Sequence, residues 1–310
     1  MVRTAVVTGG AGFIGSHVAE RLIEDGYRVI VVDDLSVGSE ERVPAEAEFE
    51  QLDIVDYERL RDLIISTSPE AIFHLGAQSM VTVSVSDPWH DSAVNVTGTL
   101  NVLQAARGEQ VPIVFTSTGG ALYGNEAPLP TPETQLPAPV APYGASKWAA
   151  EAYVQTWALA DGVPHSVCRL GNVYGPRQSP HGEAGVVSII SHKLWSGQAP
   201  TLFGHGEPTR DYVHVTDAVN AMVRAAGAGG IFNISAGREV PVREIFDLLS
   251  QESGVHVEPV LAPLREGELK RSRMDPTRAA ERLGWKTEIP LERGVPETYR
   301  ALEKEFEAGD

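Results

Sequence analysis

RTAVVTGGAGFIG, residues 3–15, carries the strongest structural signal in this chain of 310 residues. Residues 3–8 are mostly apolar and are followed by glycines, which is typical of a strand buried on both faces of a parallel sheet. Three glycines in a Gly-x-x-Gly-x-x-Gly pattern then open a helix predicted over 12–24: Gly9, Gly12 and Gly15. The N–H groups and the dipole at a helix start favour a pyrophosphate, and glycine permits its close approach. The stretch therefore predicts the phosphate loop of a dinucleotide-binding domain.

Two acidic residues follow near the distances that such a domain requires. Asp33 ends the second predicted strand, 28–33, and lies 18 residues after Gly15. A carboxylate there accepts hydrogen bonds from an adenosine ribose and repels a 2′-phosphate, so it favours NAD over NADP; the alternative is a solvated turn residue. Asp53 either bonds the adenine amino group, with Ile54 packed on the ring, or caps the helix that follows.

The same alternation of strands and helices continues to residue 170. Further strands are expected over 71–75, 112–117 and 165–170, and helices over 93–106 and 145–160. This order predicts an α/β fold, a Rossmann-type doubly wound parallel sheet. The proline-rich stretch 128–142 is expected to be a loop.

After Gly171 the pattern loosens into short elements separated by Gly and Pro, with acidic helices expected over 242–251 and 291–306. We interpret this part as a smaller mixed α/β substrate-binding domain. The expected division is 1–170 for the NAD-binding domain, which also includes a return segment near 211–235, and 171–310 mainly for the substrate domain.

The composition excludes several classes of function. The chain has 25 Lys+Arg against 42 Asp+Glu, a formal net charge of −17, which argues against a nucleic-acid-binding surface. Its single cysteine, Cys168, rules out an internal disulfide, and no secretion signal or membrane-spanning apolar run is seen, so we expect a cytoplasmic protein without membrane partners. No HExxH or Cys/His cluster suggests a metal site.

Tyr143 and Lys147 form the clearest candidate for chemistry. They are four residues apart at a predicted helix start, so both side chains project from one face. A phenol is a poor base at neutral pH, but a nearby ammonium and a positive nicotinamide ring would stabilise its phenolate. The alternative is an exposed aromatic ring beside a solvated cation. The hydroxyls of Ser117 and Thr118, at the end of a predicted strand where doubly wound sheets bind ligands, favour the catalytic interpretation.

Several motifs together resemble one known family. They are residues 7–17 (VTGGAGFIGSH), 74–78 (HLGAQ), 95–99 (NVTGT), Tyr143-x-x-x-Lys147 and 210–215 (RDYVHV). The chain is similar to the extended short-chain dehydrogenase/reductases, and within them to the bacterial UDP-glucose (UDP-galactose) 4-epimerases. The resemblance runs from the first strand to Trp285, and its motifs are more specific for the superfamily than for the substrate.

The resemblance implies roles for individual positions. Positions that match NAD-binding residues of the family are Gly9, Gly12, Phe13, Ile14, Gly15, Asp33, Asp53, Ile54, Leu75, Ala77, Gln78, Asn95, Tyr143, Lys147 and Tyr174. Its catalytic group is matched by Thr118, Tyr143 and Lys147. Positions that hold a UDP-sugar are matched by Thr118, Asn172, Val187, Arg210 and Arg265. The family also implies tightly bound NAD and a homodimer formed through the helices at 93–106 and 145–160.

Three of the substrate positions have simpler alternatives. Two arginines can clamp a diphosphate with paired hydrogen bonds, which suits Arg210 and Arg265. Arg210 could instead pair with Asp211, and Arg265 with Glu266 or Glu268. Asn172 could serve only to form a turn.

The chain departs from the family at the catalytic hydroxyl. Many relatives carry a Ser-Ser-Ser-Ala run before a Tyr-Gly pair, whereas residues 116–124 (TSTGGALYG) contain one more small residue. Alignment from the strand assigns the role to Thr118, with Ser117 in reserve. Alignment from Tyr123 would place Gly119 there, which has no hydroxyl.

The expected reaction is an NAD-dependent, redox-neutral 4-epimerisation of a UDP-sugar through a 4-keto intermediate. UDP-glucose/UDP-galactose is the first candidate substrate pair. UDP-glucuronate/UDP-galacturonate is the second, because Arg177 and Gln178 could face the C6 end of the sugar and a cation there would suit a carboxylate. In related 4,6-dehydratases an Asp-Glu pair follows the catalytic Thr, so Gly119-Gly120 disfavours dehydration. A decarboxylase remains open, and a non-catalytic NAD-binding sensor is disfavoured because the Tyr/Lys pair is kept.

Overall fold

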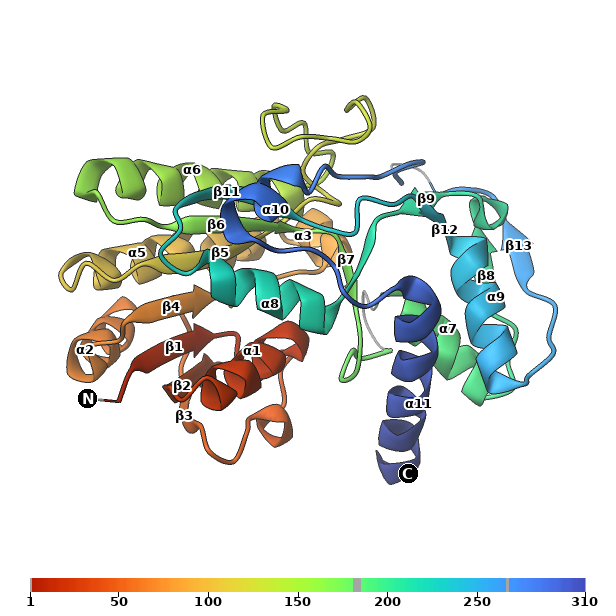
Figure 1. Cartoon of the computed structure of the whole chain (residues 1–310), viewed down its shortest axis with the longest axis horizontal. Helices are drawn as coiled ribbons and strands as arrows, with labels where there is room; N and C mark the ends of the chain where they lie inside the picture. The colour runs from red at the N-terminus through yellow and green to blue at the C-terminus, as the bar shows by residue number, and fades with distance from the viewer. Residues whose placement is uncertain (1, 181–184, 266–267, 310) are drawn as a thin grey trace.

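The computed structural model describes residues 2–180, 185–265 and 268–309. Its centre is a seven-stranded parallel sheet in the order β11-β6-β5-β4-β1-β2-β3 (Figure 1). Its strands are β1 Thr4–Thr8, β2 Arg28–Asp33, β3 Glu48–Gln51, β4 Ala71–His74, β5 Ile113–Thr118, β6 Ser166–Leu170 and β11 Gly230–Ile234. The order 3-2-1-4-5-6 is that of the doubly wound dinucleotide-binding fold. The predicted fold class is therefore confirmed.

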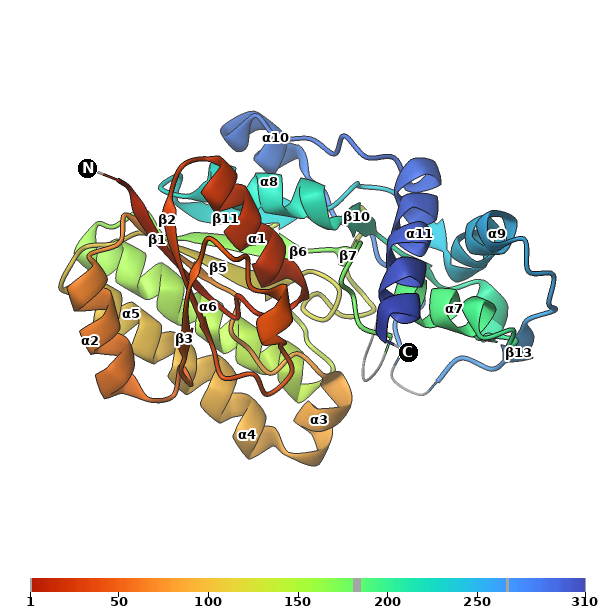
Figure 2. The same ribbon diagram turned by 90° about the horizontal axis from the view of Figure 1, so that it is seen from below.

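Helices cover both faces of this sheet (Figure 2). One face packs against α1 Phe13–Glu24, α8 Val215–Ala225 and α10 Thr277–Leu283, and the other against α2 Tyr57–Thr67, α5 Thr99–Arg107 and α6 Pro142–Asp161. Val7 packs toward the first group and Val6 toward the second, because successive side chains of a strand point to opposite faces. Both faces are buried, which explains the continuous apolar runs of the sequence.

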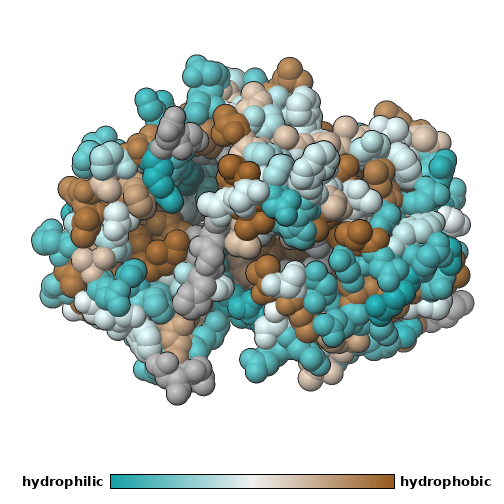
Figure 3. Space-filling view, turned by 180° about the vertical axis from the view of Figure 1, so that it is seen from behind, coloured by the Kyte–Doolittle hydropathy of each residue, from teal (hydrophilic) through white to brown (hydrophobic). Residues whose placement is uncertain are grey.

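A second lobe lies beside the carboxyl ends of the strands (Figure 1). Its helices are α7 Val186–Trp195, α9 Val242–Ser253 and α11 Leu291–Gly309. Short strands complete it: β7 Asn172–Tyr174 with β10 Tyr212–His214, β9 Thr209–Arg210 with β12 Val240–Pro241, and β8 Thr201–Phe203 with β13 Val260–Ala262. It has its own apolar core, which contains Tyr174, Val187 and Tyr212. Seen from behind, a notch separates the two lobes (Figure 3).

The segment expected as one helix over 93–106 is more complex. It starts as a π-helix, η2 Ala93–Gly98, and continues as α5; two short helices precede it, α3 Val81–Ser86 and α4 Pro88–Ser92. The side chain of Ile54 packs directly on Gly98, where an added Cβ would lie 2.6 Å from Ile54 Cδ1. A π-helical turn widens the helix locally, and such turns are frequent at functional sites. Single 3₁₀ turns occur at η1 Glu40–Arg42 and η3 Gly204–Gly206. Among the described residues, no helix is both long and apolar enough to cross a bilayer.

Candidate active site

The phosphate loop is held by close backbone contacts. Gly9 has φ +70°, and a Cβ added to it would lie 2.6 Å from the backbone nitrogen of Gly76, at the end of β4. A Cβ on Gly15 would overlap the carbonyl oxygen of Gly9. Helix α1 then begins at Phe13, and its N-cap residue, Gly12, has no side chain to cap the first turn. Glycine at these two positions is therefore required for the close-packed turn of this loop.

Asp33 supports this loop from the end of β2. Its Oδ2 accepts a hydrogen bond from the N–H of Ala11 at 3.0 Å, and its Oδ1 accepts one from Leu35 at 2.9 Å. The side chain is buried, and burial raises the pKa of the carboxyl while these two hydrogen bonds oppose the rise. The alternative of a solvated turn residue is therefore wrong. Its contact with a ribose stays a prediction.

Asp53 and Ile54 differ in their surroundings. Asp53 is exposed, and its Oδ1 accepts a hydrogen bond from the N–H of Val55 at 2.9 Å. The cap of α2 is Asp56, whose side chain accepts from Arg59, so the helix-cap alternative for Asp53 is wrong. Ile54 is buried against Gly98. Their contacts with adenine stay predictions.

The segment after β4 is fastened by Asn95. The N–H of Gln78 donates to Asn95 Oδ1 at 2.9 Å, and Asn95 Nδ2 lies 2.9 Å from the carbonyl oxygen of Gln78. Asn95 Nδ2 also lies 3.1 Å from Asp91 Oδ1 and 3.0 Å from Ser146 Oγ, on α6. The buried Asn95 therefore joins Gln78 to α6. Contacts of Leu75, Ala77, Gln78 and Asn95 with a cofactor stay predictions.

Helix α6 presents the Tyr/Lys pair at its first turns. It begins at Pro142, whose fixed φ suits a first helical position. Lys147 is buried, with Nζ 4.5 Å from the centroid of the Phe115 ring on β5. Burial lowers the pKa of Lys147 to about 8, while Glu151 and Asp91 act in the opposite direction. The alternative of a solvated cation is therefore wrong. Tyr143 is half-buried, and its carbonyl oxygen accepts from Ser146 Oγ at 3.0 Å.

Thr118 and Asn172 face a common space. Thr118 ends β5, and its Oγ1 accepts a hydrogen bond from the N–H of Ala121 at 3.1 Å, so the hydroxyl proton remains available. A Cβ added to Gly120 would lie 3.6 Å from Asn172 Oδ1 and 4.0 Å from Thr118 Oγ1. The hydroxyl of Ser117 is buried and has no hydrogen-bond partner among the described residues. This geometry favours Thr118 over Ser117 as the hydroxyl that meets a substrate.

The extra small residue of this loop has a packing explanation. A Cβ on Gly119 would overlap the sulfur of Met274. Met274 is buried and is held by its N–H, which donates to Asp211 Oδ2 at 2.9 Å. Gly119 therefore accommodates Met274, which supports the alignment that leaves the catalytic hydroxyl to Thr118.

The two candidate arginines lie on either side of one carboxylate. Arg210 NH2 is 3.5 Å from Glu268 Oε1, and Arg265 Nε is 3.3 Å from Glu268 Oε2. Arg210 also donates from NH1 to the carbonyl oxygens of Thr209 and Leu269, each at 2.9 Å. The guanidinium of Arg265 stacks on the ring of Phe203, 4.2 Å from its centroid. Glu268 was predicted only as a partner of Arg265, and no pattern in the sequence singled out Met274.

The structure tests the simpler alternatives for Arg210, Arg265 and Asn172. Asp211 accepts hydrogen bonds from the N–H groups of Met274 and Gly237, so its predicted pairing with Arg210 is wrong. Pairing of Arg265 with Glu268 is confirmed, and Glu266 lies outside the described residues. Asn172 belongs to strand β7, paired with β10, so its role is not only that of a turn former.

The guanidinium of Arg177, which was considered for the C6 end of the sugar, contacts helix α1. Its guanidinium pairs with Glu20 and lies 3.2 Å from His17 Nδ1, both on α1. Gln178 Nε2 donates to the carbonyl oxygen of Val173 at 3.0 Å. The suggestion that Arg177 recognises a sugar carboxylate therefore loses its support.

Tyr174 and Val187 are buried in the core of the second lobe. The ring of Tyr174 packs edge-on against His214 and Tyr212. Their side chains therefore have a packing role, and their contacts with ligands stay predictions. The described residues include no cluster of three or more His, Cys, Asp or Glu that could hold a metal ion.

Comparisons with known proteins show which family this chain resembles. Residues 5–235 match the model of the NAD dependent epimerase/dehydratase family. The chain is 44% identical over 302 residues to UDP-glucose 4-epimerase of Mycolicibacterium smegmatis, covering 94% of this chain and 96% of that protein. Its structure resembles that of the Thermotoga maritima UDP-glucose 4-epimerase with UDP-glucose, with TM-score 0.95, 43% identity and coverage of 98% and 99%. It also resembles the Thermus thermophilus UDP-glucose 4-epimerase complex with NAD, with TM-score 0.90, 38% identity and coverage of 96% and 98%.

Proposed function

The chain belongs to the NAD dependent epimerase/dehydratase family, and from this premise we propose that it interconverts UDP-glucose and UDP-galactose by NAD-dependent 4-epimerisation. The observation that carries the proposal is the position of buried Lys147 one helical turn after Tyr143. Both lie near the carboxyl end of the sheet, where Thr118 and Asn172 face a common space. This arrangement offers a base, a cation that activates it and polar groups that orient a hydroxyl.

The residues present fit NAD. Gly9 and Gly15 allow a close-packed turn at the start of α1 that a Cβ at either position would prevent, and the buried carboxylate of Asp33 is fixed beside this turn. We propose that these residues hold the pyrophosphate and the adenosine ribose, with Phe13 and Ile14 at the first turn of α1. When bound, NAD supplies reversible hydride acceptance from C4 of the sugar.

The chain's own contribution to the reaction is proton transfer and orientation. We propose that the Tyr143 phenolate takes the proton from the sugar 4-hydroxyl and later returns it. The Lys147 ammonium stabilises that phenolate in a site shielded from water, where a charge has a larger effect. Thr118 donates its free proton to the sugar O4.

The nucleotide diphosphate fits the arginine pair. Arg210 and Arg265 present two guanidinium groups to the space now bridged by Glu268, and a diphosphate would compete with that carboxylate for the same donors. A local pair of arginines attracts a polyanion in spite of the net charge of −17. In our proposal, Asn172 lines the route from this pair to the sugar.

Specific observations weigh against the other candidate reactions. A UDP-glucuronate epimerase would need a cation for the sugar carboxylate, and Arg177 is engaged by Glu20 instead. Dehydration would need an acid and a base after Thr118, where Gly119 packs on Met274. A sensor without catalysis would not need the unfavourable burial of Lys147.

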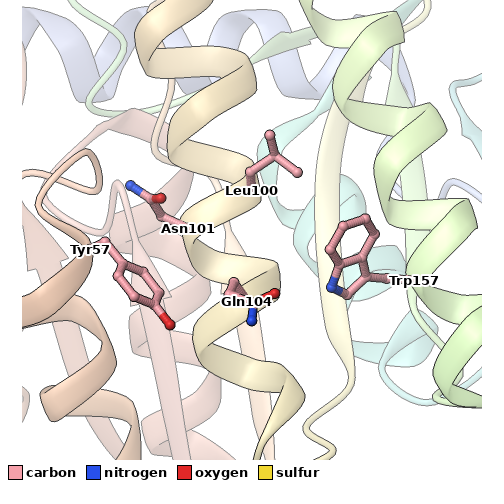
Figure 4. Close-up of a pocket in the computed structure, with 5 residues that line it drawn as sticks. All are labelled: Tyr57, Leu100, Asn101, Gln104 and Trp157. Atoms are coloured by element: carbon pink, nitrogen blue, oxygen red, sulfur yellow. The ribbon is translucent and has the colours of Figure 1, made fainter.

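We further propose a homodimer formed through α5 and α6. A shallow pocket of about 300 Å³ lies between α2, α5 and α6 and is lined by Tyr57, Leu100, Asn101, Gln104 and Trp157 (Figure 4). Leu159 on α6 is 87% exposed, and Trp148 and Tyr153 are partly exposed on the same helix. A second copy would cover this apolar surface. The division into an NAD-binding domain (1–170 with a return near 211–235) and a substrate domain (171–310), and a cytoplasmic location, are parts of the same proposal.

NMR spectroscopy tests the activity directly. Purified protein is incubated without added NAD, in one tube with UDP-glucose and in another with UDP-glucuronate, and the anomeric and H4 signals are followed. We expect the galacto epimer to form in the UDP-glucose tube, faster than in the other. If neither epimer forms, even with NAD added, the proposal is wrong; a faster UDP-glucuronate reaction would overturn the choice of sugar.

A further inference from the structure

His74 ends β4 and lies between the phosphate loop and α6, the helix that carries Tyr143 and Lys147. Its side chain is buried, with Nδ1 2.7 Å from Thr8 Oγ1 and Nε2 3.0 Å from Thr99 Oγ1. Thr8 immediately precedes the phosphate-loop glycine Gly9. Thr99 is the first residue of α5. The imidazole therefore bridges the residue before the phosphate loop and the first residue of α5, which itself bonds Asn95.

The neighbours of His74 determine which nitrogen carries its proton. The Thr99 hydroxyl has one proton, and it donates to the carbonyl oxygen of Asn95 at 2.7 Å. Thr99 Oγ1 must therefore accept from His74 Nε2–H. A neutral imidazole has one N–H, so Nδ1 accepts from the hydroxyl of Thr8, which in turn accepts from the N–H of Gly76 at 3.2 Å. Every bond in this chain then has one donor and one acceptor.

The hydrogen-bond network continues to α6, the helix that carries Tyr143 and Lys147. Asn95 receives the Thr99 hydrogen bond at its carbonyl, and its side-chain Nδ2 lies 3.0 Å from Ser146 Oγ. The Ser146 hydroxyl donates to the carbonyl oxygen of Tyr143 at 3.0 Å. One continuous set of hydrogen bonds thus runs from Thr8 to Tyr143.

The surroundings require the imidazole to stay neutral. Burial, with a contribution from the Lys147 charge, lowers the pKa of His74 to about 3. A protonated imidazole would have two donors and would leave the Thr8 hydroxyl without its acceptor. It would also place a second buried cation near Lys147.

We propose that His74, neutral and protonated on Nε2, is a positioning residue that holds the phosphate loop at a fixed distance from Tyr143 and Lys147. The inference rests on the proposed function, in which one NAD molecule must contact both the loop and the catalytic pair. Loosening this link lets the two contacts drift apart, and small misplacements of reacting groups reduce rates strongly.

The first test is spectroscopic and uses the ¹⁵N-histidine-labelled holoenzyme. The His74 signals are assigned as those lost in the variant His74→Asn. We expect a protonated Nε2 and an unprotonated Nδ1 that do not change between pH 5.5 and 8.5. A proton on Nδ1, or a titration within this range, overturns the proposal.

The second test separates the two halves of the bridge. His74→Asn keeps an acceptor near the Nδ1 position, His74→Gln keeps a donor near the Nε2 position, and His74→Leu keeps neither. We expect turnover to fall about tenfold for Asn and Gln and about 100-fold for Leu, with faster NAD release. The KM for UDP-glucose should stay within about twofold, because the arginines belong to the other lobe.

His165→Asn is the matched control. His165 is also buried, and its Nδ1 accepts from the N–H of Ile113 at 3.1 Å, just before β6 and away from the site. It should lose thermal stability but keep turnover and NAD retention. If the His74 variants behave like His165→Asn, His74 has only a structural role. NAD release distinguishes the two proposals, since it can be measured even if the wild-type protein does not epimerise UDP-glucose.

Discussion

Lys147 and His74 are almost completely buried, whereas the side chain of Arg265 is 63% exposed. We call Thr8, His74, Asn95, Tyr143 and Lys147 the cofactor half of the site, and Arg210, Arg265 and Glu268 the arginine half. The cofactor half is joined by hydrogen bonds in a dry environment, where charges interact strongly. The arginine half has one carboxylate between two cations, close to solvent. The difference suggests that the first half controls turnover and the second controls affinity.

The largest expected effect comes from Tyr143→Phe. Removing the proposed base should lower kcat by about 10³-fold, while NAD stays bound because the phosphate loop and Lys147 are intact. Turnover is measured by NMR, and bound NAD by its release on denaturation. Tyr153→Phe on the same helix is the control and should keep full activity. Comparable losses in both variants would contradict the assignment of the base.

Lys147→Met should separate activity from stability. Turnover should fall about 10²-fold. A pKa lowered from 10.5 to about 8 means that the buried charge costs about 3 kcal/mol of folding stability at pH 7.

The pH dependence of this cost gives the sign of the effect. Between pH 8 and 10.5 the unfolded chain binds more protons at Lys147 than the folded chain, so wild-type stability rises with pH in this window. The stability gain of Lys147→Met is therefore full below pH 8 and lost by pH 10.5. Denaturant unfolding at pH 7 and pH 10 measures it. Equal differences at both pH values would show that Lys147 carries no unfavourable charge.

Arg210→Ala tests the arginine half. Arg210 is half-buried and makes charge-assisted hydrogen bonds, so the KM for UDP-glucose should rise about 30-fold with little change in kcat. Steady-state kinetics measure both values. A fall in kcat with unchanged KM would contradict the proposal that the arginine half controls affinity and the cofactor half controls turnover.

The smallest effect is expected for Arg265→Ala. Because Arg265 is exposed, solvent and salt screen its charge, and the KM should rise only about threefold at physiological salt. The rise should shrink further at 1 M salt. Arg243→Ala is the control, since Arg243 also lies over a phenylalanine, Phe246, in the same lobe. An effect of Arg265→Ala as large as that of Arg210→Ala would end the distinction between them.

Much of the cofactor half was predictable from the sequence. Its signals are local: the continuous apolar runs of buried strands, glycines at a loop, and a four-residue spacing that places Tyr143 and Lys147 on one helix face. The fold class followed from the same patterns. The burial of Asp33 and Lys147 excludes the solvated alternative for each residue.

The errors fall where distant segments meet. The sequence allowed Arg177 to face the sugar, but Arg177 pairs with Glu20, 157 residues earlier. Asp211 was offered as a partner of Arg210, yet it binds backbone N–H groups near residues 237 and 274. Nothing in the spacing of these residues encodes such partners.

Local periodicity and turn chemistry were enough to order the strands and helices and to place the glycine loop, the acid at Asp33 and the Tyr/Lys pair. Folding alone selected Met274 as the neighbour of Gly119, set Glu268 between two arginines and gave His74 its tautomer. Backbone geometry repeats every two or 3.6 residues and leaves a pattern in the sequence. Contacts between separate elements depend on how whole elements pack, and they leave no such pattern.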